Sequence, residues 1–96
     1  MIKAVIVDDE LSIRNSIRNI LNLKYSDIDL AASAGSVKEG VESIIRYKPD
    51  LVFLDIEMPD GTGFDLIDRL TPIDFKTIFI TAHQEYALDA IKVSAL

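Results

Sequence analysis

The chain has 96 residues, with 10 Lys or Arg against 16 Asp or Glu, and therefore carries a formal net charge of −6 at pH 7. This length accommodates one small domain with its own core, and so acidic a domain is a poor candidate for binding a nucleic-acid backbone directly. Since the chain contains no Cys and one His, disulfides, thiolate zinc sites, cysteine catalysis and His-rich metal sites are all excluded.

The first third of the chain predicts a strand, a helix and a second strand. Residues 2–7 are almost continuously apolar, which is typical of a strand buried on both faces of a parallel sheet. From Leu11 onward, apolar residues recur at helical spacing and predict an amphipathic helix that fades near 24–27. The strand at 30–34 is weak in composition, and we predict it mainly because it lies between two helical patterns.

A capping box marks the start of the next helix. Ser36 stands at the N-cap position and Glu39 follows three residues later. The helix is expected to stop before Pro49, because the residue preceding a proline disfavours the helical conformation. A second strongly apolar strand follows at 51–54 and leads directly into an acid, Asp55.

The remainder predicts a turn, a helix, a strand and a final helix. Residues 58–63 are rich in turn formers, and apolar residues at helical spacing over 64–70 are followed by a Thr-Pro pair that closes the helix. Residues 77–81 form a fourth strand pattern, and a last helical pattern covers 86–94.

The predicted order is therefore βαβαβαβα, with short connections and no repeat or linker. Because crossovers between parallel strands are right-handed, this order predicts an α/β fold with a doubly wound parallel sheet. No apolar run is long enough to span a membrane and no signal-peptide pattern is present, so we expect a cytoplasmic domain.

Polar residues with oxygen ligands stand where three of the predicted strands end. Asp8 and Asp9 follow the first strand, Asp55 follows the third, and Thr81 ends the fourth. In an open parallel sheet, ligands bind beyond the carboxyl ends of the strands, so these side chains are expected to converge at one edge. Carboxylates gathered in this way repel one another unless a cation lies among them, and an all-oxygen set favours Mg²⁺.

A purely structural interpretation of the same acids stays open at this point. Loops are polar, so acids often follow strands without any function. Asp8 also suits the start of a helix, where the helix dipole favours negative charge. An acid at the end of one strand is weak evidence for a site, whereas acids at the ends of both strong central strands are harder to explain in that way.

The residues of these motifs resemble those of the receiver domain of two-component response regulators, which has a flavodoxin-like fold. The residues that carry the resemblance are VIVDDE at 5–10, PDLVFLDIEMPDGTGF at 49–64 and IFITAH at 78–83. The resemblance extends in order and spacing along the whole chain, 1–96. The stretches TAH at 81–83 and YALDA at 86–90 are similar to the LytTR-type regulators, whose separate output domain binds DNA.

The resemblance implies a role for each of these acids. Asp55 would be the phosphoryl acceptor, attacking the phosphohistidine of a sensor histidine kinase. Asp9 would bind Mg²⁺ directly, Asp8 largely through water, Asp55 would be a further ligand, and Glu57 would contribute its backbone carbonyl. Thr81 would be the switch hydroxyl that bonds the phosphoryl oxygen and so biases the last helix. On this interpretation the domain is a phosphoacceptor rather than an enzyme, and it regulates transcription through a fused DNA-binding output domain outside this chain.

The sequence departs from the receiver pattern at its C-terminal end. Receivers are expected to have a fifth strand and helix, with a lysine at the end of that strand, and Lys92 lies inside a helical pattern and cannot take that role. The domain is therefore expected to be incomplete at its C-terminus. Two consequences follow as expectations: a receiver-like protein-interaction module not competent for phosphorylation remains the alternative function, and the fourth strand becomes a sheet edge through which the chain self-associates.

Overall fold

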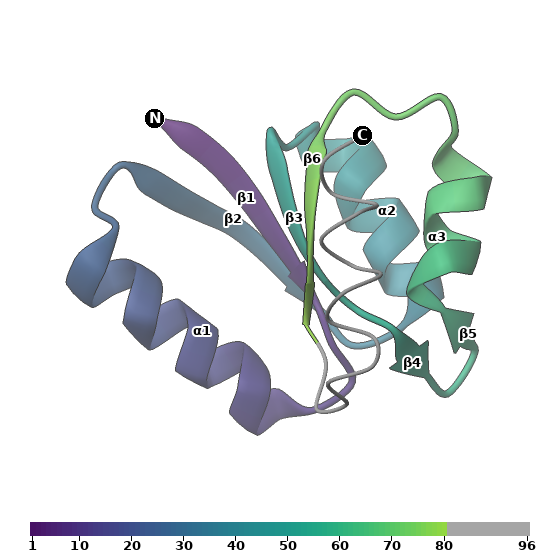
Figure 1. Ribbon diagram of the computed structural model, residues 1–96, viewed down its shortest axis with the longest axis horizontal. Helices are drawn as coiled ribbons and strands as arrows, with labels where there is room; N and C mark the ends of the chain where they lie inside the picture. Colours follow the sequence, from purple (N-terminus) through teal and green to yellow (C-terminus); the bar gives the residue numbers. More distant parts are fainter. Residues whose placement is uncertain (81–96) are drawn as a thin grey trace.

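The structure is a computed structural model that describes residues 1–80, so the predicted Thr81 and the last helical pattern lie outside the described residues. Nine helices and strands follow one another within residues 1–80 (Figure 1). They are β1 (Ile2–Val7), α1 (Leu11–Lys24), β2 (Ile28–Ala34), α2 (Val37–Tyr47), β3 (Leu51–Asp55), β4 (Glu57–Met58), β5 (Gly61–Thr62), α3 (Gly63–Leu70) and β6 (Lys76–Ile80).

The main sheet has four strands in the order β2-β1-β3-β6, and every neighbouring pair is parallel. Figure 1 shows α1 on one face of this sheet and α2 and α3 together on the other. Helices on both faces of a parallel sheet are what the doubly wound prediction requires, so the predicted α/β flavodoxin-like fold is confirmed.

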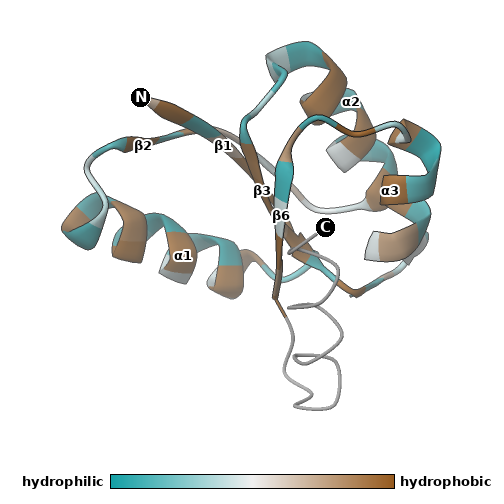
Figure 2. Ribbon diagram, turned by 45° about the horizontal axis from the view of Figure 1, so that its top comes forward, coloured by the Kyte–Doolittle hydropathy of each residue, from teal (hydrophilic) through white to brown (hydrophobic). Residues whose placement is uncertain are grey.

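Successive residues of the central strands lie on opposite faces of the sheet. Val5, Val7, Val52 and Leu54 belong to the core cluster under α2 and α3, where Leu66 of α3 is completely buried. In Figure 2 the central strands are mostly hydrophobic, whereas the helices alternate between hydrophobic and hydrophilic residues. Strands buried on both faces explain why the sequence of β1 runs apolar without alternation.

Helix ends follow the expected chemistry with one difference. The Ser36 hydroxyl accepts a hydrogen bond from the Glu39 N–H at 3.1 Å, as the capping box predicts. The Glu39 carboxylate, however, accepts from the N–H of Gly35 at 3.2 Å instead of from that of Ser36. α2 ends at Tyr47, with Lys48 in the left-handed region at φ 48°, so the helix stops before the proline as predicted.

Three features of the strands differ from the sequence prediction. β2 begins two residues earlier because Ile28 pairs with Ile2. β6 begins one residue earlier because the Lys76 N–H donates to the Asp50 carbonyl at 2.9 Å. The segment predicted as a turn contains a small antiparallel hairpin, β4–β5, which is too short to show a strand pattern in sequence. Within residues 1–80, no helix is long and apolar enough to cross a membrane.

Candidate functional site

Three aspartates meet at the carboxyl end of the sheet. β1 and β3 are hydrogen-bonded neighbours with Val7 opposite Leu54, so the residues that follow this pair come side by side. One carboxylate oxygen from each of Asp8, Asp9 and Asp55 lies within 4.8 Å of the others. The predicted convergence is therefore present for the three aspartates, whereas Thr81 lies outside the described residues.

The three aspartates differ in burial and in their contacts. Asp8 is 1% exposed, Asp55 is partly buried and Asp9 is exposed. The backbone N–H of Asp8 donates to the Ala34 carbonyl at 3.0 Å, and its carboxylate accepts from the Glu10 N–H at 2.8 Å. The main chain at Asp8 thus continues the β1–β2 hydrogen bonding beyond the end of the strand.

Burial and mutual repulsion disfavour negative charge at this edge. The pKa of Asp55 is raised to about 7, first by burial, then by the charge of Asp8 and by a hydrogen bond with Asp9. The backbone N–H of Glu57 opposes this shift. The pKa of Asp8 is also raised, mainly by burial. Such a set of oxygen ligands fits a hard divalent cation such as Mg²⁺, whose charge would relieve the repulsion.

One basic side chain lies near this edge. The positive charge of Arg14 on α1 works against the upward shift of the Asp8 pKa. The guanidinium lies beside Gly35, where a Cβ would be 3.4 Å from Nη1, and its buried Nε has no hydrogen-bond partner. Arg14 lies in the helix that the sequence predicts from Leu11 onward, but no local pattern connects it to the strand ends.

The loop that follows Asp55 is held closely against the site. The Gly63 N–H donates to the Ile56 carbonyl at 2.8 Å, and a Cβ at Gly63 would lie 2.5 Å from the Asp55 carbonyl oxygen. Only glycine fits such an approach. A capping box between Thr62 and Asp65 then starts α3.

The tip of the same loop contacts another element. Both carboxylate oxygens of Asp60 accept backbone hydrogen bonds from the first turn of α2, from Val37 at 2.8 Å and from Lys38 at 3.0 Å. No local pattern in the sequence predicts this contact, since the partners lie more than twenty residues away along the chain.

Two phenylalanines connect the start of α3 with β6. The rings of Phe64 and Phe79 have centroids 5.1 Å apart and are tilted by 39° to each other. This distance lies in the range that favours aromatic pairs. The contact joins the element that follows the Asp55 loop to the strand whose last residue precedes Thr81.

The predicted site residues are thus placed as follows. The structure brings Asp8, Asp9 and Asp55 together. Glu57 opens the short hairpin two residues after Asp55, and its side chain is exposed. Thr81 lies outside the described residues.

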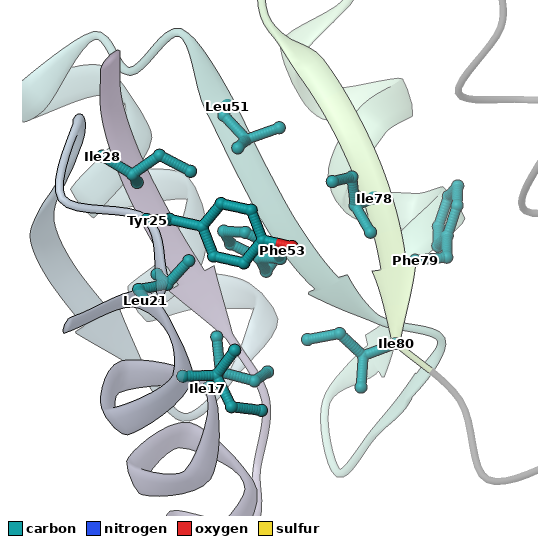
Figure 3. A pocket seen from close by; sticks show the side chains of 10 residues that line it. Ile17, Leu21, Tyr25, Ile28, Leu51, Phe53, Ile78, Phe79 and Ile80 are labelled. Atoms are coloured by element: carbon teal, nitrogen blue, oxygen red, sulfur yellow. The ribbon is translucent and has the colours of Figure 1, made fainter. Parts of the chain in front are cut away.

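An apolar groove of about 550 Å³ lies on the α1 face of the sheet (Figure 3). In Figure 3, side chains of α1 line one side of the groove and side chains of β3 and β6 line the other. Its lining consists of Ile17, Ile20, Leu21, Tyr25, Ile28, Leu51, Phe53, Ile78, Phe79 and Ile80. None of these residues is charged, so the groove has no part in binding a cation.

Comparison with known proteins identifies the family. Residues 4–96 match the response regulator receiver domain. The chain is 34% identical over 98 residues to "Sensory transduction protein LytT" of Bacillus anthracis, covering all of this chain and 39% of that protein. It is 38% identical over 96 residues to "Transcriptional regulatory protein BtsR" of Escherichia coli K12, covering 99% of this chain and 40% of that protein. The chain therefore spans about two fifths of the length of these relatives.

A solved structure of a response regulator domain is also similar to this chain. The REC domain of AraT, a response regulator from Geobacillus stearothermophilus, aligns with a TM-score of 0.81 at 30% identity, covering 96% of this chain and 74% of that one. The names LytT and BtsR among the relatives agree with the predicted LytTR-type resemblance. With its fold, its motifs and nearly its whole length matching, the chain belongs to the response regulator receiver domain family.

Proposed function

We propose that this domain accepts a phosphoryl group on Asp55 from the phosphohistidine of a sensor histidine kinase. The observation that carries the proposal is the meeting of Asp8, Asp9 and Asp55 within 4.8 Å at the carboxyl end of the sheet. Structural acids at strand ends have no reason to gather where burial and repulsion oppose their charge, whereas a cation-dependent site requires it. Membership of the receiver family supports the same conclusion.

The chain's own residues would divide the work of the transfer. A carboxylate oxygen of Asp55 attacks the phosphorus, the bond to the histidine nitrogen breaks, and the leaving imidazole keeps the bond's electron pair and takes up a proton. Asp9, Asp8 and the backbone carbonyl of Glu57 would hold Mg²⁺, with Asp55 as a further ligand. The cation supplies the positive charge without which three carboxylates would exclude an anionic phosphoryl group.

Thr81 is the proposed switch residue. It follows β6 directly, and a hydroxyl there would donate a hydrogen bond to a phosphoryl oxygen on Asp55. Asp55 is paired with Ile80 in the β3–β6 register, which supports this role because it brings the end of β6 beside the acceptor. Formation of the acyl phosphate would then bias the segment after β6 between two states.

The test is a phosphorylation assay on the isolated chain. The wild type is treated with acetyl phosphate and Mg²⁺ and followed by intact mass, and beryllofluoride with Mg²⁺ is followed by NMR. Both responses are expected in the wild type and in an Asp50→Asn control, and both should be lost in Asp55→Asn. Absence of any Asp55-dependent response would favour the alternative, a receiver-like interaction module that is not competent for phosphorylation.

The partners of the whole protein follow from the same proposal. The phosphoryl donor would be a sensor histidine kinase in the cytoplasm, and the switch would act on a fused DNA-binding output domain of LytTR type that regulates transcription. The relatives named as transcriptional or sensory transduction proteins support this assignment. We propose no direct nucleic-acid contact for this chain, because its charge is −6.

We also propose that this 96-residue chain pairs with a second copy of itself through β6. Within residues 1–80, β6 pairs only with β3, and Ile78 at its centre is 46% exposed beside the apolar groove. The β6 edge that no other strand within residues 1–80 pairs with would match an identical edge in a two-fold arrangement, since both present alternating N–H and C=O groups. Light scattering behind size exclusion should detect a dimer that Ile78→Lys disrupts, and a stable wild-type monomer at micromolar concentration would contradict this.

A further inference from the structure

We propose that Asp60 is a positioning residue for the acidic site: its carboxylate ties the loop after Asp55 to the first turn of α2, and so fixes the Glu57 carbonyl relative to Asp8. This inference rests on the proposed function, because it assigns a role within the same site. It adds a residue that is neither a ligand of the cation nor the phosphoryl acceptor.

The contacts of Asp60 are those of an anchor between distant segments. Its two carboxylate oxygens accept from the N–H groups of Val37 and Lys38 at 2.8 and 3.0 Å, across 23 and 22 residues of sequence. The side chain lies at the surface, yet both of its oxygens are engaged. These two backbone hydrogen bonds lower the pKa of Asp60, which keeps the carboxylate ionised and a strong acceptor.

The base of the loop is fixed by other bonds, so the anchor acts on the tip. The Gly63 N–H is bonded to the Ile56 carbonyl, and the capping box of Thr62 and Asp65 fixes the start of α3. Within residues 1–80, the side-chain hydrogen bonds that join 56–61 to a different element are those of Asp60. Without them, the β4–β5 hairpin would be held beyond its base only by apolar packing, in which Met58 contacts the core cluster.

These bonds complete a closed path around the acids. The N–H of Asp8 is bonded to the carbonyl of Ala34, the last residue of β2, and α2 begins three residues later at Val37. Asp60 then connects Val37 to the loop that leads back to Asp55. The segment at Asp8 and the loop after Asp55 are thereby connected through α2, in addition to the pairing of β1 with β3.

The chemistry of the site explains why such a path matters. Mg²⁺ demands near-octahedral geometry with short, uniform ligand distances. A ligand on a rigid strand end meets this demand without help, whereas a backbone carbonyl in a loop meets it only if the loop is held in place. Glu57 is in the loop, and Asp60 is three residues away from it.

The experiment compares Mg²⁺ affinity in Asp60→Ala, Asp60→Asn and Asp50→Ala. Asp50 is the matched control: it too is an exposed aspartate whose carboxylate accepts a backbone N–H, that of Lys3 at 2.9 Å, but at the opposite end of the sheet. Titration with Mg²⁺ by calorimetry, at a temperature where circular dichroism finds each variant folded, should give an affinity about tenfold weaker for Asp60→Ala. Asp60→Asn, which keeps one acceptor, should lie between this variant and the wild type, and Asp50→Ala should bind as the wild type does.

A second measurement on metal-free protein separates this inference from the proposed function. Amide hydrogen exchange of Val37, of Lys38 and of the β4–β5 hairpin at 57–62 should accelerate in Asp60→Ala and stay unchanged in Asp50→Ala. A wild type that binds no Mg²⁺ would refute the proposed function and, with it, the role of Asp60 in that site, while the exchange data would still decide whether Asp60 anchors the loop. Normal Mg²⁺ affinity in Asp60→Ala, or unchanged exchange in the β4–β5 hairpin, would overturn the inference.

Discussion

The two ends of the central sheet use the same residue type in opposite ways. At the amino end, Asp50 bridges three strands: its carboxylate accepts from the Lys3 N–H at 2.9 Å, its N–H donates to the Lys3 carbonyl at 2.8 Å, and its carbonyl accepts from Lys76 at 2.9 Å. At the carboxyl end, Asp8 and Asp55 lie beside other acids, and burial raises the pKa of both.

The two ends therefore differ in how an ionised aspartate affects the stability of the fold. A carboxylate that accepts backbone N–H groups stabilises the folded chain. A carboxylate buried near other carboxylates lowers stability for as long as it is ionised, and proteins keep such groups at functional sites. The same substitution, Asp→Asn, is therefore expected to have opposite effects on stability at the two ends.

The largest effect is expected from Gly63→Ala, which disrupts the carboxyl end directly. The new Cβ would lie 2.5 Å from the Asp55 carbonyl oxygen and 3.0 Å from Leu54 Cγ, so backbone must move. We expect the free energy of unfolding to fall by about 3 kcal/mol, as for other overpacked sites. Urea unfolding would measure this. Gly35→Ala is the control, because its nearest neighbour is the end of the Arg14 side chain at 3.4 Å, and an equal loss in both variants would contradict the explanation.

Asp55→Asn is expected to stabilise the metal-free protein at pH 8. The folded-state pKa of Asp55, about 7, lies above its ordinary value of 3.8, so its contribution to stability is present below about pH 4 and is lost as the pH rises through 7. The amide removes this penalty, and because solvent screens a partly exposed carboxylate, we expect the free energy of unfolding to rise by about 2 kcal/mol at pH 8, roughly half of what the full shift would give. The gain should shrink at pH 5. A gain that is independent of pH would show that ionisation of Asp55 is not its cause.

Mg²⁺ should offset the repulsion among the acids at the carboxyl end of the sheet and so raise the free energy of unfolding. At a free concentration ten times the dissociation constant, binding to the folded state alone raises the free energy of unfolding by about 1.4 kcal/mol. Thermal unfolding with and without MgCl₂ would measure the gain. The gain should disappear in Asp9→Asn, and an equal gain in that variant would mean that the cation binds elsewhere.

The smallest effect on the free energy of unfolding is expected from Asp50→Asn, and its sign is opposite to that of Asp55→Asn. The asparagine oxygen still accepts from Lys3, but as a neutral and therefore weaker partner at an exposed position. We expect a loss of about 0.5 kcal/mol at pH 8, where Asp55→Asn gives a gain. Urea unfolding of both variants in one buffer provides the comparison. Stabilisation by Asp50→Asn would remove the contrast between the two ends.

Much of this arrangement follows from the sequence, because strand ends are encoded locally. The apolar runs at 2–7 and 51–54 predict β1 and β3, and parallel pairing then brings Asp8, Asp9 and Asp55 to one edge. The doubly wound fold follows from the alternation of elements. The individual roles given to these acids come from the family resemblance and stay predictions.

What could not be predicted depends on contacts between distant segments. The bonds from Asp60 to α2 connect residues that share no local pattern, and nothing in the helical spacing of Arg14 indicates that it lies near Asp8. The β4–β5 hairpin has two residues in each strand, fewer than any periodicity needs to show itself. Such details emerge only once the chain is folded.

The contact between Phe64 and Phe79 has a spectroscopic consequence. The chain has no Trp, but the two rings lie 5.1 Å apart across the gap between α3 and β6, the elements that flank the proposed acceptor. Each ring shifts the proton resonances of the other through its ring current, and that shift changes steeply with distance and tilt. The aromatic NMR signals of unlabelled protein therefore report any movement of β6 relative to the start of α3.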